Sequence, residues 1–188
     1  MSAGLEIVAV SNFMTHNVKT ISQVQSLKEA AKTMYENDIG GIVVVTIDRS
    51  AKPAGIITER DILKVVAYDQ LCQPTTATTA SHGLPSPSLL DMTVINFMSK
   101  PVTTISSSAS LWDAIQLMYH SSVRRLPVVD HEKLVGIITE KDVIKAIANN
   151  SSLICELQER LPSLSTMSGS MFERIREVAF SDGFLPIR

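Results

Sequence analysis

Two short segments of the chain each combine a threonine with an aspartate three residues later. They are Thr58 with Asp61 and Thr139 with Asp142. Each pair suits a helix start, where a hydroxyl caps free backbone N–H groups and an acidic side chain faces the positive end of the helix dipole. The same residue types also suit a nucleotide, because a helix start attracts phosphate and a carboxylate can accept hydrogen bonds from both ribose hydroxyls. Both interpretations stay open at this point.

The chain contains few other residues with the spacing that catalysis needs. It has no HExxH, GxSxG, phosphate-binding P-loop or GxGxxG motif. Its histidines and cysteines lack the spacing of metal ligands or of a redox pair: His16, His82, His120, His131, Cys72 and Cys155. We therefore expect a protein that is not an enzyme, requires no cofactor, holds no metal and keeps its thiols reduced.

Both threonine–aspartate pairs lie at equivalent places in an internal repeat. NFMTHNVKTIS (12–22) recurs as NFMSKPVTTIS (96–106), an offset of 84 residues, and GIITERDILK (55–64) recurs as GIITEKDVIK (136–145), an offset of 81. The second copy is therefore three residues shorter between its two strands. A match that stays in register over this length indicates duplication of one structural unit.

An amphipathic helix is predicted near the start of each copy. Its apolar residues lie at positions i, i+3, i+4, i+7 and i+8. They are Leu27, Ala30, Ala31, Met34 and Tyr35 in the first copy, and Leu111, Ala114, Ile115, Met118 and Tyr119 in the second. Ser26 and Ser110 stand where an N-cap is expected. We expect this face, including both tyrosines, to form core.

A hairpin and a second helix complete each copy. β-branched runs at 42–47 and 126–129 precede a polar turn and a strand ending in GIIT, and helices are expected over 59–68 and 140–149. Each copy therefore reads strand, helix, strand, strand, helix. A unit of about 55 residues buries only about 60% of its unfolded surface. We expect an α+β fold in which the copies pack sheet to sheet about a pseudo-twofold axis.

The segments outside the copies differ in character. Residues 71–88 are rich in Thr, Ser and Pro, which favours a solvated linker over a regulatory phosphorylation tract. Residues 150–188 are too few for an independent catalytic or DNA-binding domain. They contain apolar residues on one face of a predicted helix: Met171, Phe172, Ile175, Val178 and Ala179. We expect this C-terminal helical extension to bind a partner or a second copy.

Composition limits the classes of protein to consider. The 188 residues have 45% hydrophobic content, which is typical of a globular protein, and a formal net charge of −2 with no run of Lys or Arg. The chain therefore lacks the clustered positive charge that drives nucleic-acid binding through counterion release. No apolar stretch approaches the roughly 20 residues of a membrane-spanning helix. We expect a cytoplasmic protein that binds neither nucleic acid nor membrane.

The motifs in their order resemble the CBS domain, from NFM…VxTIS through RRLPVVD (124–130) to GIITExD. The chain resembles a tandem CBS pair, or Bateman module, with repeats at 10–68 and 95–149, a linker at 69–94 and the extension at 150–188. The resemblance implies a regulatory module with two clefts for adenosine-containing ligands, namely AMP, ADP, ATP or S-adenosylmethionine. It also implies a homodimer that transmits ligand occupancy to an unknown regulated protein.

In that family each cleft joins the threonine–aspartate pair of one repeat to base-contacting backbone of the other. Carried onto this chain, one cleft contains Thr58, Asp61, Pro101, Val102, Thr103, Val123, Arg124 and Arg125. The other contains Thr139, Asp142, Asn17, Val18, Lys19, Ile39, Gly40 and Gly41. The two arginines favour phosphorylated ligands in the first cleft, whereas the two glycines predict weaker AMP or ATP binding in the second. Alternatively, one arginine only braces the fold through a surface carboxylate.

A different class of function stays open. In that hypothesis the chain is a structural or scaffolding CBS pair without a physiological nucleotide. Its threonine–aspartate pairs are then helix caps only, and its extension makes a protein interface. Arg60 and Lys141 either supply charge to a cleft or lie on a solvated helix face.

Overall fold

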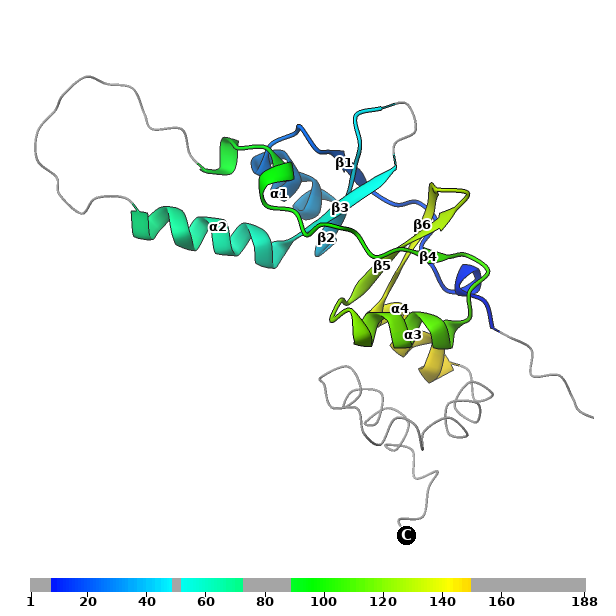
Figure 1. Cartoon of the computed structure of the whole chain (residues 1–188). Coiled ribbons are helices and arrows are strands. Elements are labelled where there is room, and N and C mark those ends of the chain that lie inside the picture. The colour runs from blue at the N-terminus through cyan, green and yellow to red at the C-terminus, as the bar shows by residue number, and fades with distance from the viewer. Residues whose placement is uncertain (1–7, 49–51, 73–88, 150–188) are drawn as a thin grey trace, which may run out of the picture. The chain divides into compact units, whose positions relative to one another are not determined.

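The computed structural model describes residues 8–48, 52–72 and 89–149 (Figure 1). They form two compact units. The first-repeat unit contains residues 18–48, 52–72, 89–102 and 132–134. The second-repeat unit contains residues 8–17, 103–131 and 135–149. The expected C-terminal helix and most of the expected linker lie outside the described residues.

The first-repeat unit has the predicted order of elements. These are β1 (Thr20–Ser22), α1 (Leu27–Asn37), β2 (Gly41–Val45), β3 (Pro53–Thr58) and α2 (Glu59–Cys72). The sheet has the order β1-β2-β3, with β1 parallel and β3 antiparallel to β2. Helix α2 begins where predicted but continues to Cys72, beyond the expected end at residue 68. The strand-to-helix junction that carries Thr58 and Asp61 is thus part of regular structure.

The second repeat has the same order of elements, which lie in the second-repeat unit except for Lys133 and Leu134 at the start of β6. Its elements are β4 (Ile105–Ser106), α3 (Leu111–His120), β5 (Arg125–Asp130), β6 (Lys133–Thr139) and α4 (Glu140–Asn149). The sheet has the order β4-β5-β6, with β4 parallel to β5. His131 and Glu132 join β5 to β6 with φ of 48° and 63°, the left-handed conformations that a two-residue hairpin turn uses. The predicted hairpin is confirmed, and the fold is mixed α/β with two three-stranded sheets.

Both predicted N-caps are confirmed as capping boxes. In α1 the Glu29 N–H donates to Ser26 Oγ at 3.2 Å, and the Ser26 N–H donates to Glu29 Oε2 at 2.9 Å. In α3 the Asp113 N–H donates to Ser110 Oγ at 3.0 Å, and the Ser110 N–H donates to Asp113 Oδ2 at 3.1 Å. Each box satisfies two backbone donors at the helix start and fixes where the helix begins.

The apolar faces of α1 and α3 form most of the expected core, but Ala31 and Tyr119 are only half-buried and Tyr35 is exposed. The buried residues are Leu27, Ala30 and Met34 in α1, and Leu111, Ala114, Ile115 and Met118 in α3. The expectation that Tyr35 is core is wrong, because this residue is 89% exposed. At about 100° per residue, position i+8 lies about 80° around the helix from position i, so Tyr35 stands at the edge of the buried face. Tyr119 is half-buried against the core.

The segment at the start of each repeat packs in the unit of the other repeat. In the second-repeat unit, Val10 is fully buried and its N–H donates to the Ala109 carbonyl at 2.8 Å. Thr15 and Ile137 exchange two backbone hydrogen bonds of 2.9 Å each. Residues 8–15 therefore belong to the core of the second-repeat unit, although they lie at the start of the first repeat in sequence.

The corresponding segment at 92–99 packs in the first-repeat unit. Val94 is fully buried, and its N–H donates to the Gln25 carbonyl at 2.8 Å. Ser99 and Ile56 exchange backbone hydrogen bonds of 2.8 and 3.2 Å. We call residues 8–15 and 92–99 the exchanged segments. The expected sheet-to-sheet packing of the repeats stays a prediction. Within the described part of the chain, no helix is both long and apolar enough to cross a membrane.

Candidate functional site

The first threonine–aspartate pair joins β3 to α2. The Thr58 N–H donates to Asp61 Oδ2 at 3.0 Å, and Thr58 Oγ1 donates to the same oxygen at 2.6 Å. Lys64 Nζ lies 4.0 Å from the other oxygen, Asp61 Oδ1. The side chain of Asp61 is 17% exposed. The carboxylate is therefore held in one orientation by the end of the preceding strand.

The second pair has the same geometry at the junction of β6 and α4. The Thr139 N–H and Oγ1 donate to Asp142 Oδ2 at 2.9 and 2.6 Å, and the Asp142 N–H donates to Thr139 Oγ1 at 3.3 Å. Among the described residues, none donates a hydrogen bond to Asp142 Oδ1. The capping interpretation is thus confirmed as a structural role, and it leaves one oriented carboxylate oxygen for another partner.

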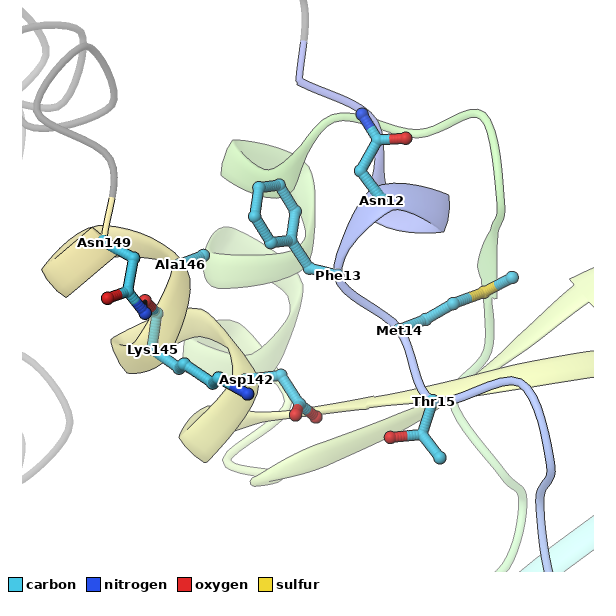
Figure 2. A pocket seen from close by; sticks show the side chains of 8 residues that line it. All are labelled: Asn12, Phe13, Met14, Thr15, Asp142, Lys145, Ala146 and Asn149. Atoms are coloured by element: carbon cyan, nitrogen blue, oxygen red, sulfur yellow. Dashed lines mark hydrogen bonds between the residues drawn. The ribbon is translucent and has the colours of Figure 1, made fainter.

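A pocket of about 450 Å³ opens beside Asp142, within the second-repeat unit. Figure 2 shows the exchanged segment 12–15 on one side and α4 on the other, with the Asp142 carboxylate pointing toward Thr15. The lining residues are Asn12, Phe13, Met14, Thr15, Asp142, Lys145, Ala146 and Asn149. Of these, only Asp142 is a site residue predicted from the sequence. The exchange of segments, which places 12–15 next to α4, has no signature in residue periodicity.

The glycines predicted for the second cleft lie beside Thr58 in the first-repeat unit. Gly41 pairs with Thr58 in the β2–β3 ladder, and the Glu59 N–H donates to the Gly40 carbonyl at 3.4 Å. Five further predicted site residues also belong to this unit: Val18, Lys19, Ile39, Pro101 and Val102. Gly40 and Gly41 thus have a structural role at the start of α2 in their own unit.

The arginines predicted for the first cleft lie at the equivalent place in the second-repeat unit. The Glu140 N–H donates to the Arg124 carbonyl at 2.9 Å, and Arg124 Nε lies 3.8 Å from Glu140 Oε2. The Glu140 side chain is only 8% exposed, whereas that of Arg124 is 63% exposed. Arg124 thus lies beside a carboxylate of its own unit, but this carboxylate is buried and not on the surface, so the alternative role of an arginine as a brace stays a prediction. Asn17, Thr103, Val123 and Arg125 belong to this unit as well.

Each predicted cleft takes residues from both units, so the assembled clefts stay predictions. Within the second-repeat unit, the pocket combines a carboxylate, an ammonium group, two amides and a hydroxyl with the apolar Phe13, Met14 and Ala146. No His or Cys is among its described lining residues. Across the described ranges, no group of three or more His, Cys, Asp or Glu residues is placed to hold a metal ion. The arrangement suits binding of a polar organic molecule.

The CBS-domain family model matches residues 10–68 and 94–149, which contain both threonine–aspartate pairs and both exchanged segments except for residues 8, 9, 92 and 93. The chain belongs to the CBS-domain family. Because the model matches twice, the protein is a tandem CBS pair, as the sequence resemblance implied.

Relatives of this CBS pair include proteins of similar length and longer ones. The CBS domain-containing protein YhcV of Bacillus subtilis is 32% identical over 145 residues, which cover 77% of this chain and 89% of YhcV. The uncharacterized protein MJ1404 of Methanocaldococcus jannaschii is 37% identical over 140 residues, or 74% of this chain. That match covers only 32% of MJ1404, so the CBS pair spans about a third of that relative.

Two similar solved structures contain ligands. The CBS domain pair of protein MJ0100, in complex with 5′-methylthioadenosine and S-adenosyl-L-methionine, aligns with a TM-score of 0.61 and 24% identity over 76% of this chain and 98% of that one. CBSX2 in complex with AMP aligns with a TM-score of 0.57 and 24% identity over 76% of this chain and 97% of that one. These likenesses show that the fold is shared.

Proposed function

We propose that this CBS pair is a cytoplasmic regulatory module that binds an adenosine-containing ligand, catalyses no reaction and transmits ligand occupancy to a partner protein. The observation that carries the proposal is the orientation of Asp142. Its Oδ2 is fixed by two hydrogen bonds from Thr139, while its Oδ1 accepts none from the described residues and lies beside a pocket of about 450 Å³. A carboxylate held in this way loses little side-chain freedom when a ligand donates to it.

The expected ligand follows from the chemistry of that carboxylate. A carboxylate only accepts hydrogen bonds, and the two hydroxyls of a ribose are a matching pair of donors. The ligands in the two similar CBS structures, 5′-methylthioadenosine, S-adenosyl-L-methionine and AMP, all contain an adenosine group. The same geometry recurs at Asp61, which supports a second ligand position in the first repeat.

Thermal denaturation of the full chain tests the proposal. AMP, ADP, ATP, adenosine and S-adenosylmethionine are added separately, with guanosine and GMP as controls. A ligand at 100 times its Kd stabilises the native state by about 2.7 kcal/mol, so at least one adenosine compound should raise the Tm by several degrees. If none does, the module is a scaffold whose threonine–aspartate pairs serve only as caps.

We further propose that the CBS pair forms a homodimer. Helix α2 supports this, because Leu63 and Val66 are 67% and 38% exposed, whereas the corresponding Ile144 and Ile147 of α4 are half-buried and buried. Exposed apolar side chains one helical turn apart suit a contact with a second copy. Light scattering should give twice the monomer mass, and Leu63→Glu should reduce it. A monomer at high concentration contradicts the proposal.

A further inference from the structure

Lys145 shares the pocket with Asp142. The two residues are three positions apart on α4, so their side chains lie on the same side of the helix, about 4.5 Å apart along its axis. Both line the pocket, and Lys145 is exposed (Figure 2). A ligand that donates hydroxyls to Asp142 therefore extends within reach of the Lys145 ammonium group.

The ammonium group of Lys145 is not committed to a carboxylate of the described residues. In the first repeat the equivalent Lys64 lies 4.0 Å from Asp61 Oδ1. In the second repeat, no Asp or Glu oxygen of the described chain lies within 4.0 Å of Lys145 Nζ. The positive charge is thus available to a bound molecule.

No other charged side chain lies among the described lining residues. Besides Asp142 and Lys145, the lining consists of neutral residues: Asn12, Phe13, Met14, Thr15, Ala146 and Asn149. Asn149 Nδ2 already donates to the Lys145 carbonyl at 2.9 Å. Lys145 is therefore the group in this lining that can recognise a negative charge. The pocket suits a molecule with hydroxyls at one position and an anionic group at the next.

We infer that Lys145 is a specificity-determining residue, which makes the Asp142 pocket select a phosphorylated adenosine compound. This inference rests on the proposed adenosine-binding function. A phosphate gains a charge-assisted hydrogen bond from the ammonium group. Adenosine gains nothing there. S-adenosylmethionine has a carboxylate, but its sulfonium and ammonium groups give it a net positive charge, which disfavours binding beside Lys145. If the Asp142 pocket selects AMP in this way, AMP binds well beside Asp142, contrary to the weak binding expected from Gly40 and Gly41.

Titration calorimetry on an Asp61→Asn variant tests the inference, because this change weakens the first-repeat site and isolates the second. AMP should bind about tenfold more tightly than adenosine or S-adenosylmethionine, the effect expected of one hydrogen bond to a charged group. Lys145→Gln should bring the AMP-to-adenosine affinity ratio close to one while changing the Kd for adenosine by less than about twofold. Lys145→Arg should retain the preference for AMP.

Lys64→Gln is the matched control, because it removes the same charge from the equivalent position of the other repeat. In the Asp61→Asn background it should leave the AMP-to-adenosine ratio unchanged. Circular dichroism of each variant verifies folding. An unchanged ratio in Lys145→Gln, with adenosine still bound, overturns the role of Lys145 and leaves the proposed function standing. Absence of binding by every adenosine compound to the unmodified protein overturns both.

Discussion

The side chain of Met98 lies directly on Gly55, so closely that a β-carbon at position 55 would lie 2.5 Å from Met98 Sδ and 2.9 Å from the Ser99 carbonyl oxygen. Ser99 is held there by the two backbone hydrogen bonds that it exchanges with Ile56. Gly136 has the same relation to Met14, except that its β-carbon would meet only side-chain atoms of that methionine. Each exchanged segment thus docks on a strand through a close contact at a glycine, and at Gly55 this contact includes backbone.

Gly55→Ala should lower the free energy of unfolding by about 1–3 kcal/mol, because the Ser99 carbonyl cannot move away without loss of its hydrogen bonds. Gly136→Ala should lower the free energy of unfolding by a smaller amount, because the flexible side chain of Met14 can shift. Urea denaturation of both variants measures the difference. Equal midpoints would show that the backbone contact at Gly55 does not limit substitution.

Asp142→Ala should weaken adenosine-ligand binding at its own pocket by about tenfold or more, corresponding to the loss of charge-assisted hydrogen bonds worth about 1.5–3 kcal/mol. It should also lower stability by about 1 kcal/mol through loss of the cap. Asp113→Ala is the matched control, because Asp113 caps α3 in the same way but does not line the pocket. Asp61→Ala should act equally at the first repeat. If calorimetry finds unchanged ligand binding in both the Asp61 and the Asp142 variants, these residues only cap helices and do not bind the ligand.

Arg124→Gln should lower the free energy of unfolding by about 1 kcal/mol, because the mostly buried Glu140 loses the guanidinium 3.8 Å away. Glu140→Gln in the same variant should recover part of that loss, and a double-mutant cycle measures the coupling. The double variant Arg124→Gln with Arg125→Gln should also weaken AMP and ATP binding at the Asp61 cleft. Unchanged nucleotide affinity would leave bracing as the only role shown for Arg124.

Glu29 should make stability depend on acid pH. Its pKa is lowered from the usual 4.5, chiefly by the hydrogen bond from the Ser26 N–H and then by those from the side chains of Gln25 and Ser26. A lowered pKa in the folded state gives stability that is present above about pH 4.5 and is lost as the pH falls through the folded value.

In Glu29→Gln the amide oxygen can still accept from Ser26, so only the titrating charge is removed. Urea denaturation between pH 3 and pH 6 should therefore show a shallower acid loss of stability in this variant than in the unmodified chain. Parallel curves for the two proteins would mean that Glu29 titrates alike when folded and unfolded.

The elements were predictable because their signals are local. Capping serines, apolar spacing of three and four residues, and β-branched runs before GIIT each lie within a short window of sequence. The wrong prediction that Tyr35 is core shows where apolar spacing fails. A residue at the edge of a helical face is buried only if a neighbouring element covers it. Spacing along one helix contains no information about that neighbour.

The pocket beside Asp142 was predictable in part. The aspartate is marked by its recurrence with threonine. Lys145 is marked in the same way, because the first copy has Lys64 at the equivalent position. Residues 12–15 were not predictable, because their place beside α4 results from an exchange between two similar sequences. A repeat pattern reports which segments are alike, but not which copy each one contacts.

The exchange of segments also sets the order in which the chain can acquire its native structure during synthesis. Val94 is fully buried in the first-repeat unit, yet it follows the end of α2 by more than twenty residues. A ribosome that has completed α2 therefore carries a first repeat whose interior is still open. Residues 8–15 are synthesised first. Thr15 can pair with Ile137 only after β6 and α4 have been translated. Each repeat therefore completes its core only with a segment of the other, and a cut between the repeats leaves each fragment without a segment that packs in its core.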